Sequence, residues 1–308
     1  MSTKFTIQPE ADLAVQVQGL TKCYGKVCAL RGIDLEVPRG EIFGFLGPNG
    51  AGKTTTIRCL LDMIRPDGGK AQVLGLDPQA DPVTVQARTG YLPGEMQYYA
   101  NLTSERQLRF FNDMRGGQAD WGSIRQLSDR LELDLKQPIK NLSKGNKQKL
   151  GVIQALMHRP ELLILDEPTS GLDPLMQQEV LGLFREANEA GATIFFSSHI
   201  MSEVETLAQR VAIIRAGEIV EVAETSSLTH GTLSRMTVRF KRPTDFSELI
   251  KMPGIGLLSQ VDQTSITLQV TGDMERLVQE LGRLPVLDLE TERPSLEDAF
   301  MNYYHEQN

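Results

Sequence analysis

Residues 47–54 combine glycines with a lysine and a hydroxyl in the pattern GxxxxGK[ST], which is typical of phosphate-binding loops. Residues 41–46 before them predict a strand, and residues 53–64 after them predict a helix that stops before Pro66. In that setting the glycines let successive N–H groups point at phosphate oxygens, and the helix N-terminus adds its positive dipole end. Lys53 is expected to contact the β- and γ-phosphates, and Thr54 to ligate Mg²⁺. The candidate nucleotide-binding residues here are Gly47, Pro48, Asn49, Gly50, Ala51, Gly52, Lys53, Thr54 and Thr55.

Two adjacent carboxylates, Asp166 and Glu167, follow the apolar run 162–165. Neighbouring strand positions face opposite ways unless the strand ends there, so the pair marks the catalytic edge of a strand. Asp166 is expected to hold Mg²⁺ through its water shell, and Glu167 to orient and polarise the attacking water. The same two residues could also be ordinary exposed acidic residues of a loop, but the presence of a phosphate loop favours the catalytic interpretation.

His199 follows a second buried-looking strand, 193–197. Its position fits a satisfied core imidazole and a sensor of the γ-phosphate equally well.

A further motif, Leu-Ser-Lys-Gly-Asn at residues 142–146, begins 24 positions before Asp166. Ser143 can cap a helix that starts near Lys144, and Gly145 allows close backbone approach, which would create a second phosphate-binding helix terminus. With the phosphate loop and the carboxylates, this motif resembles the signature of the ATP-binding cassette family, with Lys and Asn in two positions of LSGGQ. The likeness covers about residues 13–223.

The resemblance implies ATP binding and hydrolysis with Mg²⁺, in a head-to-tail homodimer. Each ATP would lie between one copy's phosphate loop and Ser143, Gly145 and Asn146 of the other copy. Tyr24 falls where family members stack an aromatic ring on adenine. Residues 170–173, ending in Asp173, resemble the loop that crosses the dimer interface, and His199 resembles the switch histidine.

One position departs from the family pattern. Where Gln usually follows the stretch resembling 90–93, this chain has Gly94 and then Glu95. Either Glu95 replaces the glutamine as a Mg²⁺ ligand, or a backbone carbonyl or water does. Alternatively, nucleotide binding is coupled differently to the membrane permease with which such family members work. The nearby side chains are a candidate permease contact, against ordinary helix-cap packing: Met96, Tyr98 and Tyr99.

Strands and amphipathic stretches alternate along residues 13–223, which is the pattern of an α/β domain. The expected first domain, 1–225, is a P-loop NTPase core with a mostly parallel sheet, an antiparallel β subdomain and a helical subdomain at about 95–160. The expected second domain, 226–308, reads β-α-β-β-α-β and is a small α+β, ferredoxin-like accessory domain. A closing helix is predicted at 295–304.

Composition narrows the function further. A net charge of −8 and a pI near 5.2 lack the basic excess of a nucleic-acid binder. No apolar run approaches the roughly 18 residues of a membrane span, and the N-terminal residues show no signal, so a cytoplasmic protein is expected. The three cysteines form no CxxC pair, which predicts inert thiols rather than zinc or disulfides: Cys23, Cys28 and Cys59.

The sequence therefore predicts the ATPase subunit of an ABC exporter, peripheral on the inner face of the cell membrane. Its partner would be a separate integral membrane permease, because residues 295–300 are similar to the tail of such exporter subunits. A non-transport cassette ATPase acting in DNA repair or on the ribosome is the alternative. Such proteins usually carry long coiled-coil insertions or two cassettes, whereas this chain has one cassette. A phosphotransferase kinase would have no use for the 142–146 motif.

Overall fold

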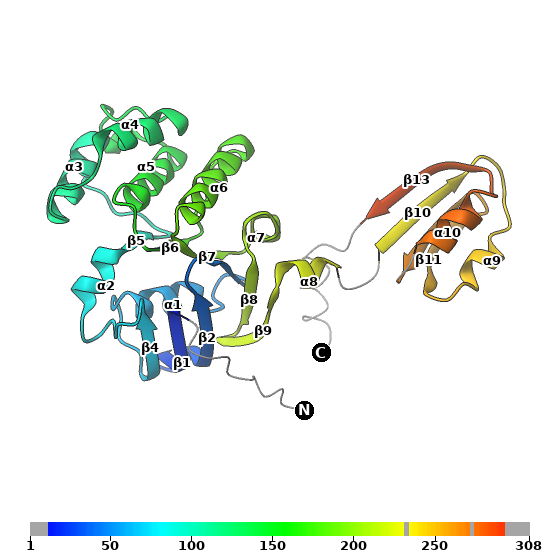
Figure 1. The fold of residues 1–308 in the computed structure, drawn as a ribbon, viewed down its shortest axis with the longest axis horizontal. Helices are drawn as coiled ribbons and strands as arrows, with labels where there is room; N and C mark the ends of the chain where they lie inside the picture. Colours follow the sequence, from blue (N-terminus) through cyan, green and yellow to red (C-terminus); the bar gives the residue numbers. More distant parts are fainter. Residues whose placement is uncertain (1–11, 231–233, 272–273, 293–308) are drawn as a thin grey trace. The chain divides into compact units, whose positions relative to one another are not determined.

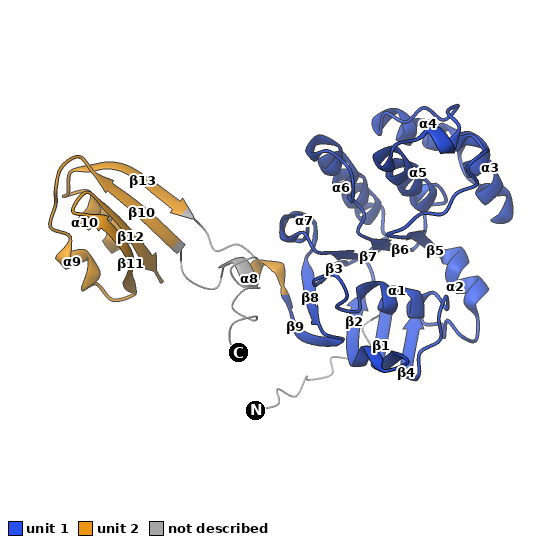
Figure 2. Ribbon diagram, turned by 180° about the vertical axis from the view of Figure 1, so that it is seen from behind, with its two compact units in different colours: residues 1–223 blue, residues 224–308 orange. Residues whose placement is uncertain are grey.

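The computed structural model describes residues 12–230, 234–271 and 274–292. The chain divides into two compact units, residues 1–223 and residues 224–308, which Figure 2 distinguishes by colour. Within the described residues, no helix is long and apolar enough to cross a membrane.

A six-stranded sheet forms the centre of the first unit. Its strand order is β5-β6-β7-β3-β8-β9, and β5–β6, β6–β7, β7–β3 and β3–β8 pair in parallel. The three strands β3, β6 and β7 are buried throughout, which explains their unbroken apolar sequences. Parallel pairing brings the carboxyl ends of these three strands to one edge of the sheet. The strand bounds are β3 Ile42–Leu46, β5 Thr89–Leu92, β6 Leu162–Asp166, β7 Thr193–Ser198, β8 Arg210–Arg215 and β9 Glu218–Glu224.

A second, antiparallel sheet has the order β2-β1-β4. Apolar side chains of this sheet, of helix α1 (Lys53–Leu60) and of the central sheet form one continuous core, which includes Leu20, Ile57 and Phe45. The antiparallel sheet is thereby fixed to the strands that carry the phosphate loop. Its strands are β1 Leu13–Tyr24, β2 Val27–Pro38 and β4 Gly68–Val73.

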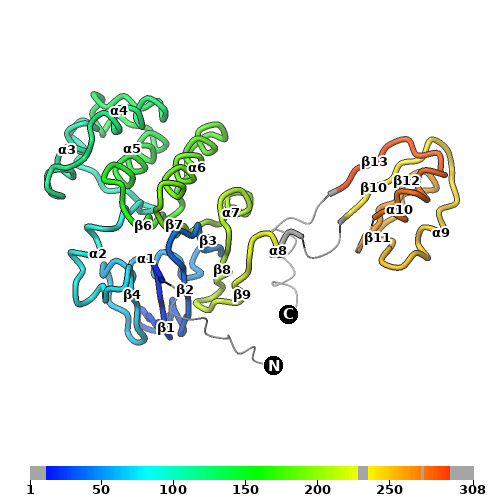
Figure 3. The backbone as a smooth tube through the Cα atoms, viewed as in Figure 1, coloured from blue at the N-terminus to red at the C-terminus, as the bar shows by residue number. Residues whose placement is uncertain are grey.

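Helices pack around the central sheet. The chain segment that connects β5 to β6 forms a separate helical group, which can be followed along the tube of Figure 3. Side chains of Thr103, Asp120, Ser143 and Asp173 cap α3, α4, α5 and α6, each satisfying a free N–H of its first turn. Arg130 of α4 forms ion pairs with two glutamates of α6, at 2.6 Å each, and links this helical group to the core. The bounds are α1 Lys53–Leu60, α2 Pro82–Arg88, α3 Ser104–Met114, α4 Trp121–Arg130, η1 Ile139–Asn141, α5 Lys144–Leu156, α6 Pro174–Glu189 and α7 Met201–Leu207.

The second unit is a four-stranded antiparallel sheet of order β11-β12-β10-β13. Alternate residues of β10 and β12 face a core shared with α9 (Ser247–Ile250) and α10 (Glu275–Leu281). This is the ferredoxin-like arrangement predicted from the element order (Figure 1). The bounds are α8 Thr225–His230, β10 Ser234–Phe240, α9 Ser247–Ile250, β11 Ile255–Asp262, β12 Ser265–Val270, α10 Glu275–Leu281 and β13 Val286–Glu292. The closing helix and the tail motif predicted at 295–304 lie outside the described residues.

The prediction of three inert thiols is wrong for two of the cysteines. Cys23 and Cys28 are register partners across the β1–β2 turn and form a disulfide. Spacing alone did not reveal the pair, because the two residues meet only once Gly25 takes the left-handed conformation that closes the hairpin. Cys59 is a buried free thiol, and burial raises its pKa to about 11.

Candidate functional site

The phosphate loop connects β3 to α1 and depends on glycine for close packing. Gly52 has a φ of +117°, and a Cβ there would lie 2.6 Å from the Ala29 carbonyl oxygen. Gly52 is the N-cap residue of α1, so no side-chain hydrogen bond caps this helix, and its first turn carries no acidic residue. The N–H groups at the start of α1 therefore remain available to an anion.

Lys53 is buried beneath this loop, with 5% of its side chain exposed. Its Nζ donates hydrogen bonds to the carbonyl oxygens of Gly47 (2.6 Å) and Pro48 (3.2 Å). Burial lowers the pKa of Lys53, and the nearby carboxylates of Glu167 and Asp166 act in the opposite direction. The ammonium group is thus held against the loop that would bind a phosphate.

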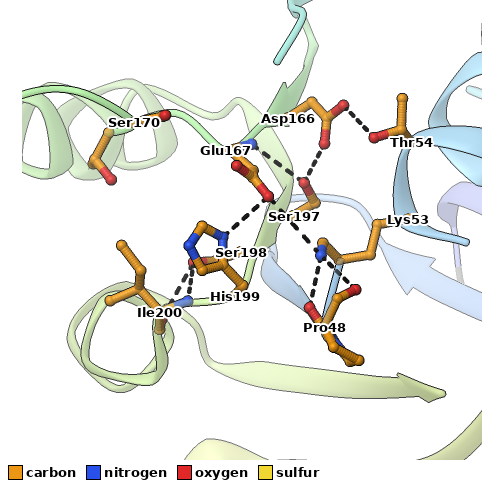
Figure 4. A network of polar contacts seen from close by, with 12 residues as sticks. Pro48, Lys53, Thr54, Asp166, Glu167, Ser170, Ser197, Ser198, His199 and Ile200 are labelled. Carbon is orange, nitrogen blue, oxygen red and sulfur yellow. Dashed lines mark hydrogen bonds and ion pairs between the residues drawn. The ribbon is translucent and has the colours of Figure 1, made fainter. Parts of the chain in front are cut away.

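Asp166, at the end of β6, is only 2% exposed. Its Oδ2 accepts a hydrogen bond from Thr54 Oγ1 (2.8 Å), and its Oδ1 accepts one from Ser197 Oγ (2.5 Å) (Figure 4). A hydroxyl oxygen and a carboxylate oxygen side by side are the hard ligands that Mg²⁺ prefers. Among the described residues no group of three or more His, Cys, Asp or Glu side chains could hold a metal. This pair therefore fits a Mg²⁺ ion that takes its remaining ligands from substrate phosphates and water.

Glu167 stands beyond the strand end, in the left-handed region at φ +51°, which is costly for a residue with a side chain. Its N–H donates to the Ser197 carbonyl oxygen (3.2 Å), and the Gln148 side chain of α5 donates to the Glu167 and Pro168 carbonyls (3.2 and 2.8 Å). These bonds hold the strained backbone. They direct the carboxylate toward His199, whose Nδ1 lies 3.0 Å from Oε1, and Lys53 Nζ lies 4.0 Å from the same oxygen.

The structure thus brings together five sequence-predicted residues from two strand ends and one helix start: Lys53, Thr54, Asp166, Glu167 and His199. The arrangement holds a cation for phosphates, a hydroxyl and carboxylate for a metal, and a carboxylate beside an imidazole. It is suited to polarising a water molecule next to a bound phosphate.

The signature residues lie elsewhere. Ser143 Oγ accepts a hydrogen bond from the Asn146 N–H (3.1 Å) and caps α5. A Cβ on Gly145 would lie 2.8 Å from the Gly171 carbonyl oxygen, so this helix start packs closely on the loop 170–173. In the described part of the chain, no hydrogen bond joins these residues to the phosphate loop. The Asp173 carboxylate is itself engaged, because it accepts from the Met176 N–H (3.0 Å) and caps α6.

Tyr24 lies at the turn of the β1–β2 hairpin with half of its side chain exposed, and Lys22 Nζ is 5.8 Å from its ring centroid. The same hairpin reaches the phosphate loop, because Ala29 and Leu30 of β2 contact the position of Gly52. An exposed ring on an element packed against the phosphate loop is available for stacking.

At the departure from the family pattern, Gly94 rather than Glu95 approaches the metal pair. A Cβ on Gly94 would lie 3.3 Å from Asp166 Oδ2, whereas Glu95 is exposed and makes no hydrogen bond or ion pair with any described residue. Two of the three candidate permease contacts face inward: Tyr98 donates to the Lys147 carbonyl (3.0 Å), and Met96 lies against Gly151. Tyr99 is 59% exposed.

Sequence reasoning missed the residues that support the site from behind. Ser197 and Ser198 could have been noticed, since two hydroxyls interrupt an otherwise apolar strand at its carboxyl end. No local signal marks the others, Gln148, Thr169 and Glu203, because each has a partner that lies 19 to 34 positions away in the chain.

Comparisons with known proteins extend this description. Residues 30–170 match the family model described as "ABC transporter". The bacitracin transport ATP-binding protein BcrA of Enterococcus faecalis is 36% identical over 219 residues, which are 70% of this chain and 71% of BcrA. The linearmycin resistance ATP-binding protein LnrL of Bacillus subtilis (strain 168) is 31% identical over 305 residues, 94% of this chain and 97% of LnrL. A solved ATP-binding subunit of an ABC transporter superposes with a TM-score of 0.64 at 28% identity, covering 70% of this chain and 92% of that one.

Proposed function

The chain belongs to the ABC transporter family, and on that premise we propose how its residues bind and hydrolyse ATP and which membrane process this drives. As a member of that family it is the ATP-binding and ATP-hydrolysing subunit of a transporter. The observation that carries the site assignment is the convergence of Lys53, Thr54, Asp166, Glu167 and His199 beside the uncapped start of α1.

In this proposal the phosphates of ATP take the place of the Gly47 and Pro48 carbonyls as partners of Lys53. The free N–H groups of the phosphate loop and of α1 bind the same phosphates, and Tyr24 stacks on the adenine. Mg²⁺, held by Thr54 and Asp166, neutralises charge on the phosphates when it is bound. Glu167 accepts a proton from the attacking water, and His199 orients that carboxylate and contacts the γ-phosphate.

A complete site requires a second copy of the chain. Ser143, Gly145 and Asn146 present a capped helix start that no hydrogen bond joins to the phosphate loop of the same chain within the described residues. A head-to-tail homodimer places that helix start against the ATP of the other copy, where its N–H groups and dipole favour the γ-phosphate. Closure of the dimer on ATP then supplies the movement that the membrane partner uses.

Dimerisation is testable with the Glu167→Gln variant, which is expected to bind ATP without hydrolysing it and to accumulate as a dimer in light scattering. Adding Ser143→Arg places a bulky side chain at the signature helix start and should return the protein to monomer in the presence of ATP. A Glu167→Gln/Ser143→Arg double variant that still dimerises with ATP contradicts the head-to-tail arrangement.

The membrane partner is an integral permease chain on whose cytoplasmic side this subunit acts, and the direction of transport is export. The names of two relatives, a bacitracin transport protein and a linearmycin resistance protein, support export of an antimicrobial compound. Coexpression with the permease should therefore lower the sensitivity of a host to such a compound, and Glu167→Gln should abolish that protection. Equal protection by the wild type and by Glu167→Gln contradicts ATP-driven export.

Glu95 is exposed and makes no hydrogen bond or ion pair with a described residue, so it contributes to the Mg²⁺ site only if its side chain turns toward Asp166 when nucleotide binds. In that case Glu95→Ala raises the Mg²⁺ concentration for half-maximal hydrolysis, and Glu95→Gln raises it less. A Mg²⁺ titration of Glu95→Ala that matches the wild type removes Glu95 from the site.

A further inference from the structure

A buried carboxylate that the proposed chemistry does not use, Glu203 of α7, lies behind the catalytic pair. Only 5% of it is exposed. Its Oε1 accepts a hydrogen bond from Thr169 Oγ1, and its Oε2 accepts one from Ser198 Oγ at 2.6 Å. It forms no ion pair with a lysine, arginine or histidine among the described residues. Burying a carboxylate whose partners are hydroxyls alone is costly. An apolar residue at this position would avoid that cost, so a buried glutamate here indicates that its two hydrogen bonds have a role.

The two hydroxyls belong to the two segments that carry the catalytic pair. Thr169 lies two residues after Glu167, and Ser198 immediately precedes His199. Because His199 Nδ1 and Glu167 Oε1 are 3.0 Å apart, a closed ring results. It runs from Glu167 along the chain to Thr169, through Glu203 to Ser198, along the chain to His199, and back to Glu167.

The hydrogen-bond directions fix the position of Ser198 within this ring. Its hydroxyl carries one proton, and Glu203 Oε2 at 2.6 Å is a closer acceptor than the Ile200 carbonyl at 3.2 Å. The Ser198 hydroxyl therefore donates its hydrogen bond to Glu203, and its oxygen accepts one from the Ile200 N–H (2.9 Å) (Figure 4). The backbone on both sides of His199 is thus oriented by Glu203.

Support of its own helix does not account for these contacts. Glu203 is the third residue of α7, where a glutamate can stabilise a helix start. Here, however, the Ile200 N–H at the N-cap is already satisfied by Ser198, and the other Glu203 oxygen leaves the helix to reach Thr169. A role confined to the helix would need no bond to Thr169.

We propose that Glu203 is a positioning residue for ATP hydrolysis, which holds the Glu167 and His199 segments at their contact distance by binding Thr169 and Ser198 together. The proposal rests on the roles proposed above for Glu167 and His199. It also gives the loop 170–173 a fixed link to the switch histidine within the same chain. Movement of His199 on loss of the γ-phosphate would then be transmitted to the loop that resembles the dimer-crossing loop of the family.

The test compares Glu203→Gln and Thr169→Val, singly and together, with wild type. An amide keeps the shape of Glu203 but offers one acceptor oxygen in place of two, and valine removes the Thr169 hydroxyl at constant shape. Each single variant should lower kcat about 10-fold while the Kd for ATP changes little, because the phosphate loop is untouched. The double variant should lose little more than either single variant, because each substitution breaks the same Thr169–Glu203–Ser198 link.

Glu205→Gln serves as the matched control, since it neutralises an exposed carboxylate of the same helix and should keep the wild-type kcat. A wild-type kcat for Glu203→Gln overturns the proposal. Losses that multiply fully in the double variant, or that accompany an equal loss of nucleotide affinity, overturn it as well. Glu167→Gln is measured in parallel: wild-type turnover in that variant refutes the proposed function, whereas wild-type turnover in Glu203→Gln alone refutes only the positioning role.

Discussion

Acid should destabilise the ATP-binding unit through His158, which follows the C-terminal end of α5. Its ring is partly buried and lines a cavity of about 660 Å³ together with Arg115. Neither ring nitrogen has a hydrogen-bond partner of ordinary geometry among the described residues, although the Thr89 backbone is close enough to favour the protonated form slightly. Burial first, and the positive charge of Arg115 second, lower the pKa of His158 from 6.5 to about 4.

The sign follows from proton binding. Between pH 6.5 and 4 the unfolded chain binds a proton at His158 that the folded chain does not. The stabilising contribution is therefore complete above pH 6.5 and is lost as the pH falls toward 4. A difference of 6.5 − 4 = 2.5 pKa units corresponds to about 3.4 kcal/mol at most, at roughly 1.4 kcal/mol per unit. At pH 5 about 2 kcal/mol of this should already be lost, and solvent screening of the partly exposed ring reduces it to about 1–2 kcal/mol.

Denaturant unfolding at pH 7.5 and pH 5 measures this effect, and the single tryptophan, Trp121 of α4, reports on the first unit alone. His158→Gln cannot be protonated, so its loss of free energy of unfolding between the two pH values should be smaller than that of wild type by about 1–2 kcal/mol. Arg159→Gln changes an exposed charge on the same cavity and should keep the wild-type loss. An equal acid loss in His158→Gln and wild type refutes the reasoning.

Three further predictions concern binding and stability. Lys53→Ala should weaken ATP binding by at least about 10-fold in a fluorescent-nucleotide titration, because a charge-assisted hydrogen bond contributes about 1.5–3 kcal/mol; unchanged affinity contradicts the role of Lys53. Reducing the Cys23–Cys28 disulfide should lower the melting temperature of the first unit by a few degrees, since a loop this short contributes about 2 kcal/mol. A Cys23→Ser/Cys28→Ser variant should not respond to dithiothreitol, and a response there contradicts the assignment. Deleting residues 224–308 should leave the Kd for ATP within about twofold, because the residues proposed to contact ATP lie in the first unit; loss of binding by a folded truncation places the second unit in the site.

Local sequence determined much of what was predicted. The strand–loop–helix around Lys53 and the polar ends of β6 and β7 follow from apolar runs that stop at glycines or charged residues. Parallel pairing then brings those strand ends together. The ferredoxin-like order of the second unit likewise follows from the alternation of short strands and helices.

The supporting contacts could not be predicted, because they depend on tertiary packing. A glutamate in a helix is expected to face solvent, and only the packing of α7 against Thr169 and Ser198 shows that Glu203 is buried. The disulfide depends on the hairpin register, and the inward orientation of Tyr98 depends on where α5 lies. Each of these features involves a partner that no local pattern identifies.

The assignment of Glu167 as the residue that activates water is tested most directly by turnover and binding in one variant. Glu167→Gln preserves the side-chain shape 3.0 Å from His199 but cannot accept the proton from water. The account predicts a Kd for ATP within about threefold of wild type and a kcat lower by about 100-fold or more, the usual contribution of a general base. A Glu167→Gln protein that hydrolyses Mg²⁺-ATP at the wild-type rate would contradict the account.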